Sequence, residues 1–116
     1  MPSHMDPERL EAEWAADADV LRSLKENGDV PTIVRPVDVR FVGSADKIGA
    51  LEKQIVSLGW RVVQRVPLDD GTEGLDVQRD QTTDHAAIRQ LTEAALQIEV
   101  QYGVQYDGWG AEATTR

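Results

Sequence analysis

Asp84-His85 is the pair of residues in this sequence that comes nearest to an acid–base couple. Nucleophilic catalysis would also require a serine or cysteine beside such a base. The chain has no cysteine, Ser44 stands where a helix should begin, and Ser57 falls inside that helix. Neighbours in sequence do not face each other at the start of a helix. We therefore interpret His85 as an exposed first-turn residue and predict no catalytic residue.

Asp69-Asp70 is the second candidate, because paired carboxylates suit a hard cation. The match to a calcium-binding loop ends with those two residues, and Asp70-Gly71 is a strong signal for a hairpin turn. Gly71 and Gly74 flank this turn rather than a strand-to-helix junction, so they do not form a phosphate-binding loop. The sequence predicts neither a metal site nor a cofactor.

The densest cluster of unusual residues is Tyr106-Asp107-Gly108-Trp109-Gly110, in a chain with 5% aromatic residues. Its two glycines can adopt positive φ, so the run predicts a turn at the end of a short strand at residues 104–106. In that turn Trp109 would fold back over the sheet or the first helix as a clasp. The other interpretation is an anchor for a protein partner, since Trp and Tyr dominate interface hot spots. The two interpretations are compatible.

Residue periodicity predicts the elements that must position these groups. Helices are expected from Asp6-Pro7 to Asn27-Gly28, from Ser44 to Gly59, and from a cap among Thr82, Thr83 and Asp84 to Gly103. Strands are expected at residues 33–42, 60–66, 73–79 and 104–106. The second helix should bury Ile48, Leu51, Ile55 and Leu58, and the second strand should point Trp60, Val62 and Val66 inward and Arg61, Val63 and Arg65 outward.

This order predicts an α+β fold with a ferredoxin-like βαββαβ core and an extra N-terminal helix. The four-stranded antiparallel sheet should carry the helices on one face, with its first and third strands as neighbours. The first helix should join the helical layer or cover its edge. We expect one domain over residues 6–110 and a frayed tail at residues 111–116. Residues 1–5 resemble an expression-vector remnant.

The charge balance limits the classes of partner. The formal net charge is −9, from 21 acidic and 12 basic residues, and this disfavours direct contact with nucleic acid. An open sheet face that binds RNA also needs stacking aromatics, whereas the outward positions here are Asp38, Arg40, Asp76, Gln78 and Asp80. No apolar run approaches the ~20 residues that span a bilayer, so we expect a cytoplasmic protein without a membrane contact.

The outer face of the first helix is rich in acidic residues, namely Glu8, Glu11, Glu13, Asp17, Asp19 and Glu26. Such a face is either a solvated helix surface or an acidic docking strip for a basic protein. The residues that we select as candidates for binding a partner are Glu11, Asp17, Asp19, Tyr106, Asp107, Gly108 and Trp109.

The run from Val104 to Gly110, directly after a helix, resembles the C-terminal signature of the regulator of ribonuclease activity B family, protein inhibitors of ribonuclease E. Residues Leu21–Asp29, Arg35–Phe41 and Leu58–Val62 are also similar to that family, so the resemblance covers nearly all of residues 6–110. It implies a ferredoxin-like core, no cofactor and no chemistry of its own. The implied partner is ribonuclease E or a related degradosome component.

Three hypotheses of different classes follow. The first is a non-enzymatic acidic regulator that modulates RNA turnover by protein–protein binding. The second is a small-molecule-sensing or acyl-handling module, which requires an apolar pocket between the helices and the sheet. The third is a weak enzyme that uses His85 with Asp84 or Asp107, which requires His85 to lie in a cleft within reach of a carboxylate.

Overall fold

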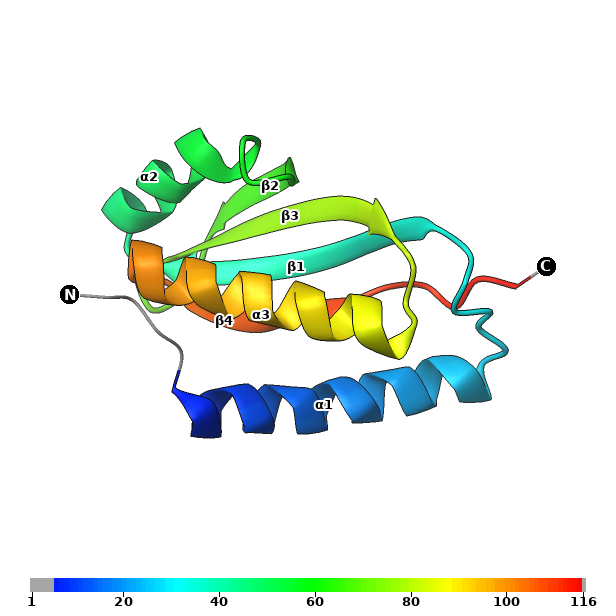
Figure 1. The fold of residues 1–116 in the computed structure, drawn as a ribbon. Coiled ribbons are helices and arrows are strands. Elements are labelled where there is room, and N and C mark those ends of the chain that lie inside the picture. The colour runs from blue at the N-terminus through cyan, green and yellow to red at the C-terminus, as the bar shows by residue number, and fades with distance from the viewer. Residues whose placement is uncertain (1–5, 116) are drawn as a thin grey trace.

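The computed structural model describes residues 6–115. These residues form three helices and four strands, joined by loops (Figure 1). The expected vector remnant, residues 1–5, lies outside the described residues. The elements in chain order are α1 (Pro7–Glu26), β1 (Arg35–Gly43), α2 (Ala45–Ile55), β2 (Arg61–Pro67), β3 (Glu73–Gln81), α3 (His85–Tyr102) and β4 (Gln105–Gly110).

The four strands form one antiparallel sheet in the order β2-β3-β1-β4. Strands β1 and β3 pair along their whole length, from Arg35 opposite Gln81 to Gly43 opposite Glu73. This is the predicted ferredoxin-like arrangement, and the α+β fold is confirmed. Helices α2 and α3 pack on one face of the sheet, as Figure 1 shows.

Helices α1 and α3 begin and end at caps that the sequence predicts. The Asp6 carboxylate accepts a hydrogen bond from the Glu8 amide at 2.9 Å, and Pro7 follows as the first helical residue. Asp84 plays the same part for α3, because its side chain accepts from the Ala87 amide. Gly103 ends α3 in the left-handed conformation, with φ of +68°.

Apolar side chains fill the space between the sheet and the two helices that cover it. Each of these residues is essentially inaccessible to water, and burial of one Val, Leu, Ile or Phe side chain is worth roughly 1.5–3 kcal/mol. The fully buried members are Val37, Phe41, Ile48, Leu51, Ile55, Leu75, Val77, Leu91, Ala95 and Leu96. The strand alternation predicted for β1 and β3 is confirmed by this set.

The prediction for the second helix and second strand was partly wrong. Helix α2 ends at Ile55, so Leu58 lies in the following turn and is 39% exposed. Strand β2 carries a β-bulge between Val62 and Gln64, which inserts one residue and reverses the alternation beyond it. Arg65 therefore lies on the helix side, where it contacts Glu52. For the same reason Val66 lies on the open side, next to Gly74.

The run Tyr106–Gly110 is a strand and not the predicted turn. Phe41 pairs with Tyr106 and Val39 pairs with Trp109, so Asp107 and Gly108 together oppose one residue of β1. This is a β-bulge, and Gly108 occupies it with φ of +91°. A glycine with positive φ serves a bulge as well as a turn, and the local sequence alone does not separate the two.

The segment after Gly110 is joined to the rest of the domain by hydrogen bonds at Thr114. The Thr114 amide donates to Asp29 Oδ1 at 2.8 Å, and the Val30 amide donates to the Thr114 carbonyl at 2.8 Å. Ala111 packs against the core. The segment therefore ties the end of β4 to the loop between α1 and β1.

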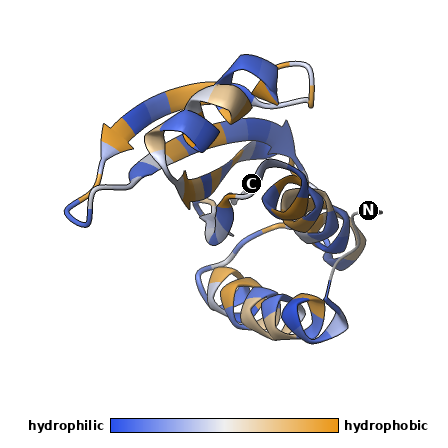
Figure 2. Cartoon of the chain, turned by 90° about the vertical axis from the view of Figure 1, so that its left-hand side faces the viewer, coloured by the Kyte–Doolittle hydropathy of each residue, from blue (hydrophilic) through white to orange (hydrophobic). Residues whose placement is uncertain are grey.

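Helix α1 packs mainly against α3 rather than directly on the sheet (Figures 1 and 2). It runs along the side of α3 next to β4, and Figure 2 shows hydrophilic and hydrophobic residues mixed along it. Its only buried residues are Asp17 and Leu24. The helix thus covers the edge of the helical layer, which was one of the two predicted positions.

Candidate functional site

The centre of the polar contacts between α1 and the core is Asp17, which is 5% exposed. Its Oδ2 accepts a hydrogen bond from the Thr92 hydroxyl on α3 at 2.5 Å. Its Oδ1 accepts one from Trp109 Nε1 on β4 at 2.9 Å. One carboxylate therefore joins α1, α3 and β4, and we call these three residues the Asp17 cluster.

The placement of Asp17 on the outer face of the helix was wrong. The residues of α1 that face the core are Leu10, Trp14, Asp17, Leu21 and Leu24, separated by alternating steps of four and three. Ala18, the next residue along the chain, is exposed. The spacing of these residues places Asp17 on the buried face of the helix. The prediction assigned Asp17 to the solvent-facing side because its side chain is a carboxylate.

Burial raises the pKa of Asp17, because desolvation disfavours the charged form. The hydrogen bonds from Thr92 and Trp109 and the nearby His85 act in the opposite direction but do not overcome burial. The Tyr106 hydroxyl lies close to Thr92 and Asp17 and makes no hydrogen bond of normal geometry to any described residue. Burial raises the pKa of this phenol as well.

A second polar contact anchors the N-terminal end of α1. The guanidinium of Arg9 contacts Glu13 on its own helix and donates to Glu99 Oε1 on α3 at 2.9 Å. It also donates to the carbonyl of Tyr106 on β4 at 3.0 Å. Glu99 in turn accepts from the Tyr106 amide at 2.8 Å. The hydrogen bond to Glu99 raises the pKa of Arg9. The bonds from Arg9 and to Glu99 also satisfy the carbonyl and the amide of Tyr106, at the start of β4.

A third contact holds the loop that follows α1. Asp29 and Arg35 form an ion pair whose side chains are 2% and 4% exposed. Asp29 also accepts from the Thr83 hydroxyl at 2.9 Å and from the Thr114 amide at 2.8 Å. Burial opposes ionisation of Asp29, but the bonds from Thr114, Arg35 and Thr83 outweigh it and lower its pKa.

The structure separates the predicted partner-binding residues into two groups. Asp17 and Tyr106 are buried, so neither side chain is available to a partner in the free protein. Glu11, Asp19 and Asp107 are exposed, and Gly108 and Trp109 are half-buried in the bulged half of β4. Trp109 serves as the predicted clasp onto the first helix, through its hydrogen bond to Asp17.

Of the residues in the weak-enzyme hypothesis, Asp84 and His85 line one hollow, and Asp107 lies apart from both. His85 is exposed and borders a groove of about 240 Å³ between α1 and α3. Asp107 lines a different hollow, beside Arg40 on the open face of the sheet. Asp84 is occupied as the cap of α3, and hydrogen bonds from Thr82 and Ala87 lower its pKa. Among residues 6–115 no three potential ligands lie close enough to hold a metal ion.

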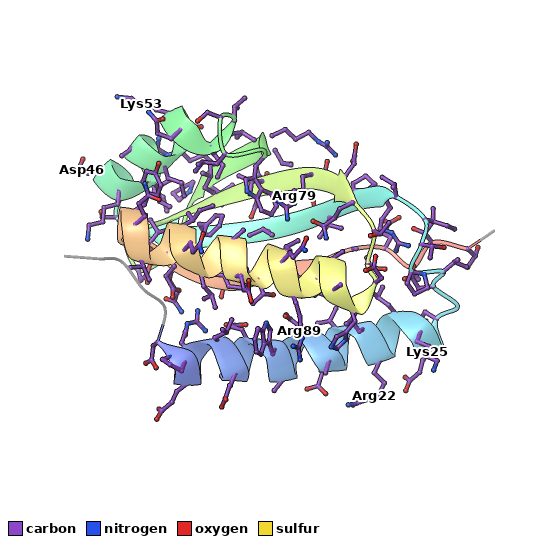
Figure 3. All side chains as sticks on the ribbon, in the orientation of Figure 1. Arg22, Lys25, Asp46, Lys53, Arg79 and Arg89 are labelled. Carbon is purple, nitrogen blue, oxygen red and sulfur yellow. The ribbon has the colours of Figure 1, made fainter. Side chains whose placement is uncertain are left out.

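The small-molecule hypothesis required an apolar pocket between the helices and the sheet. The side chains in that layer are fully buried and packed against one another. One hollow with apolar side chains lies instead between α1 and α3, where Trp14, Leu21 and Ile88 line it. Arg89 stacks on the Trp14 ring at 4.3 Å, and Figure 3 shows it between the two helices. No helix in the described part of the chain is long and apolar enough to cross a membrane.

The family model described as regulator of ribonuclease activity B matches residues 14–111. The chain belongs to this family. The resemblance noted in the sequence is therefore confirmed. A comparison with curated proteins finds no match.

The range matched to the regulator of ribonuclease activity B family includes the whole Asp17 cluster and the Asp29–Arg35 pair. It begins at Trp14, inside α1, so Arg9 and the first acidic residues of the helix precede it. The polar contacts that join α1 to the domain at its middle and its end thus fall within the family region.

The open face of the sheet carries charges that are paired with one another. Arg40 donates to Asp76 through Nε at 2.7 Å and through Nη2 at 2.9 Å. Arg61 donates to Asp80 at 2.8 Å. The bonds to Arg40 lower the pKa of Asp76. Aromatic residues that could stack on bases are missing from the outward positions of β1 and β3, so the face does not have the features of an RNA-stacking platform.

Proposed function

We propose that this protein is a non-enzymatic regulator that binds ribonuclease E, or a component assembled with it, in the cytoplasm and thereby changes RNA turnover. The observation that carries the proposal is the match of residues 14–111 to the regulator of ribonuclease activity B family. The site geometry is consistent with binding rather than chemistry, because Asp17, Arg9 and the Asp29–Arg35 pair are engaged in holding α1 and the loop after it in place.

The surface that we propose for the first encounter is the acidic outer face of α1. Glu8, Glu11, Asp19 and Glu26 are all exposed there, and the chain carries a net charge of −9. An enzyme that binds RNA must present basic segments, and complementary charge accelerates association with such a segment. Exposed charges act mainly on the association rate and lose effect as salt screens them.

The Asp17 cluster has a supporting part in this proposal. It fixes the position of α1 relative to α3 and β4, and so fixes where the acidic face lies on the protein. Asp107 and Gly108 stay as proposed contact residues because the bulge leaves them accessible. Tyr106 and Asp17 are buried, so in this proposal they support binding by stabilising the fold and not by touching the partner.

The test measures binding of the full chain to purified ribonuclease E at low salt, by an interferometry assay that resolves association and dissociation. The double substitution Glu11→Gln with Asp19→Asn should lower the association rate about tenfold, with a smaller change in dissociation. A matched control neutralises two exposed acids elsewhere, Asp46→Asn on α2 with Glu112→Gln in the segment after β4, and changes the net charge equally.

The control should change the association rate by less than about twofold, since its charges lie away from α1. Equal effects of the two double variants would assign the steering to net charge and not to α1. If the unaltered protein fails to bind ribonuclease E at low salt, the proposed function is wrong.

A further inference from the structure

The two edges of the sheet are treated differently by the rest of the chain. At the β4 edge, Arg9 donates to the Tyr106 carbonyl and Trp109 is held by Asp17, so α1 covers that edge. At the β2 edge, Arg61 to Arg65 are all exposed, and within residues 6–115 no strand pairs with the outer side of β2. Such an edge presents unpaired amides and carbonyls that can pair with another extended chain.

A cluster of exposed apolar side chains lies in the same part of the molecule. Val56, Leu58, Val62 and Val63 are 69%, 39%, 37% and 53% exposed. They account for four of the six large hydrophobic residues that are exposed among residues 6–115, and all four fall within the turn after α2 and the first half of β2. We call these four residues the β2 patch. Clustered exposed apolar residues mark interaction sites more often than scattered ones do.

Two features of β2 determine which occupant suits it. The bulge between Val62 and Gln64 twists the strand, and Pro67 at its end lacks an amide hydrogen. Both features obstruct long, flat pairing between two copies of β2. Two copies would also bring together net charges of −9 each, which repel.

The charges around β2 favour a basic occupant. Arg61 and Arg65 are already paired with acidic residues of this chain. Asp69 and Asp70 are exposed in the hairpin that follows β2, and Asp70 is held there by its hydrogen bonds with Thr72. Lys53 on the neighbouring α2 is also exposed, so the charges around β2 that form no salt bridge among the described residues are two carboxylates and one ammonium group, with a negative balance.

We propose that β2 binds a short, extended, basic segment of the partner protein as an added strand, with apolar side chains of that segment resting on the β2 patch. The inference rests on the proposed function and specifies how the partner is held. The acidic face of α1 accelerates the encounter, whereas main-chain pairing at β2 sets the lifetime of the complex.

The experiment compares two substitutions with the same chemistry at different places, Val63→Asp in the β2 patch and Val34→Asp in the loop before β1. Both valines are exposed, at 53% and 62%, and both changes add one negative charge. Binding of the full chain to purified ribonuclease E is measured for each. We expect Val63→Asp to shorten the lifetime of the complex at least tenfold, and Val34→Asp to change it less than twofold.

Amide hydrogen exchange on the unaltered complex supplies a second measurement. Strand addition should slow exchange in the peptide that covers residues 61–67, and should leave the peptide that covers α2 unchanged. Thermal unfolding of both variants checks that the folded domain is retained, since neither valine is buried.

The outcomes separate the two proposals. Loss of binding only in Val63→Asp, together with protection of β2, supports strand addition. Equal binding by Val63→Asp and the unaltered protein overturns strand addition and leaves the proposed function in place. If the unaltered protein does not bind ribonuclease E, the proposed function fails and the inference fails with it.

Discussion

The layer between the sheet and helices α2 and α3 differs in kind from the layer between α3 and α1. In the first, the contacting residues are apolar and almost all of them are completely buried. In the second, a 20-residue helix buries only Asp17 and Leu24 and leaves a groove of about 240 Å³ beside Trp14. The first layer is stabilised by buried apolar surface, and the second by a few hydrogen bonds and ion pairs.

This difference predicts how the two layers respond to stress. Apolar burial is distributed over many residues, so the core should open only when the whole domain unfolds. A net hydrogen bond contributes about 0.5–1.5 kcal/mol, or roughly 1.5–3 kcal/mol when one group is charged. Helix α1 should therefore separate from α3 at lower cost than global unfolding, while its position when attached is defined by the bonds of Asp17 and Arg9.

The largest effect should come from the apolar layer. Phe41 is completely buried, and its ring lies 6.1 Å from that of Tyr106. Phe41→Ala should lower the free energy of unfolding by about 3–5 kcal/mol, because it removes apolar contacts and leaves a cavity. Urea denaturation followed by circular dichroism measures this. A loss of unfolding free energy below about 1 kcal/mol would contradict the view that apolar packing stabilises this layer.

The buried ion pair after α1 should rank next. Asp29→Ala leaves the Arg35 guanidinium buried without its carboxylate and removes the acceptor for Thr83 and Thr114. The expected loss is about 3 kcal/mol of unfolding free energy. The matched control is Asp19→Ala, which breaks the exposed pair with Arg22 and should cost less than about 1 kcal/mol. Similar losses in both variants would remove the distinction between buried and exposed pairs.

The central strands and the helix caps could be predicted from the sequence because local rules decide them. Alternation in β1 and β3 follows from one buried face, and the Asp6 and Asp84 caps each bond within three residues of themselves. The order of the elements then restricted the topology to the ferredoxin-like arrangement. Where a partner strand decided the outcome, as at the bulges of β2 and β4, the local pattern did not suffice.

The position of Asp17 shows why the rest could not be predicted. Its two hydrogen-bond partners lie 75 and 92 residues away in the sequence, so nothing near it signals that its carboxylate is satisfied. A charged residue is rarely buried without such partners, and the default assignment to the surface followed from that. The regular spacing of Leu10, Trp14, Leu21 and Leu24 was the available signal, with Asp17 as its missing member.

A smaller effect should come from the clasp between Trp109 and α1. Trp109→Phe removes the Nε1 donor to Asp17 and should cost about 1–3 kcal/mol, chiefly as faster amide exchange in α1. Trp14→Phe is the matched control, because Trp14 Nε1 is buried without an acceptor among the described residues. Exchange in α1 should respond less to the control. An equal response would mean that ring size, and not the bond to Asp17, holds the helix.

The smallest effect compares the two buried carboxylates through their opposite responses to pH. Burial raises the pKa of Asp17, so its contribution to stability is complete below the unfolded-state pKa and is lost as pH rises through its folded-state pKa. The pKa of Asp29 is lowered, so its contribution is present above the unfolded-state pKa and is lost as pH falls through its folded-state pKa.

Asp17→Asn keeps an acceptor for Trp109 and cannot ionise. Relative to the unaltered protein, its unfolding free energy should therefore improve as pH rises from about 4, the unfolded-state pKa, towards neutrality. Urea denaturation at a series of pH values measures the difference between the two proteins. A difference that stays flat across this range would show that Asp17 ionises as easily in the folded protein as in the unfolded chain. In that case the layer beneath α1 would be wet, and its hydrogen bonds would hold the helix less firmly than the geometry of the Asp17 cluster implies.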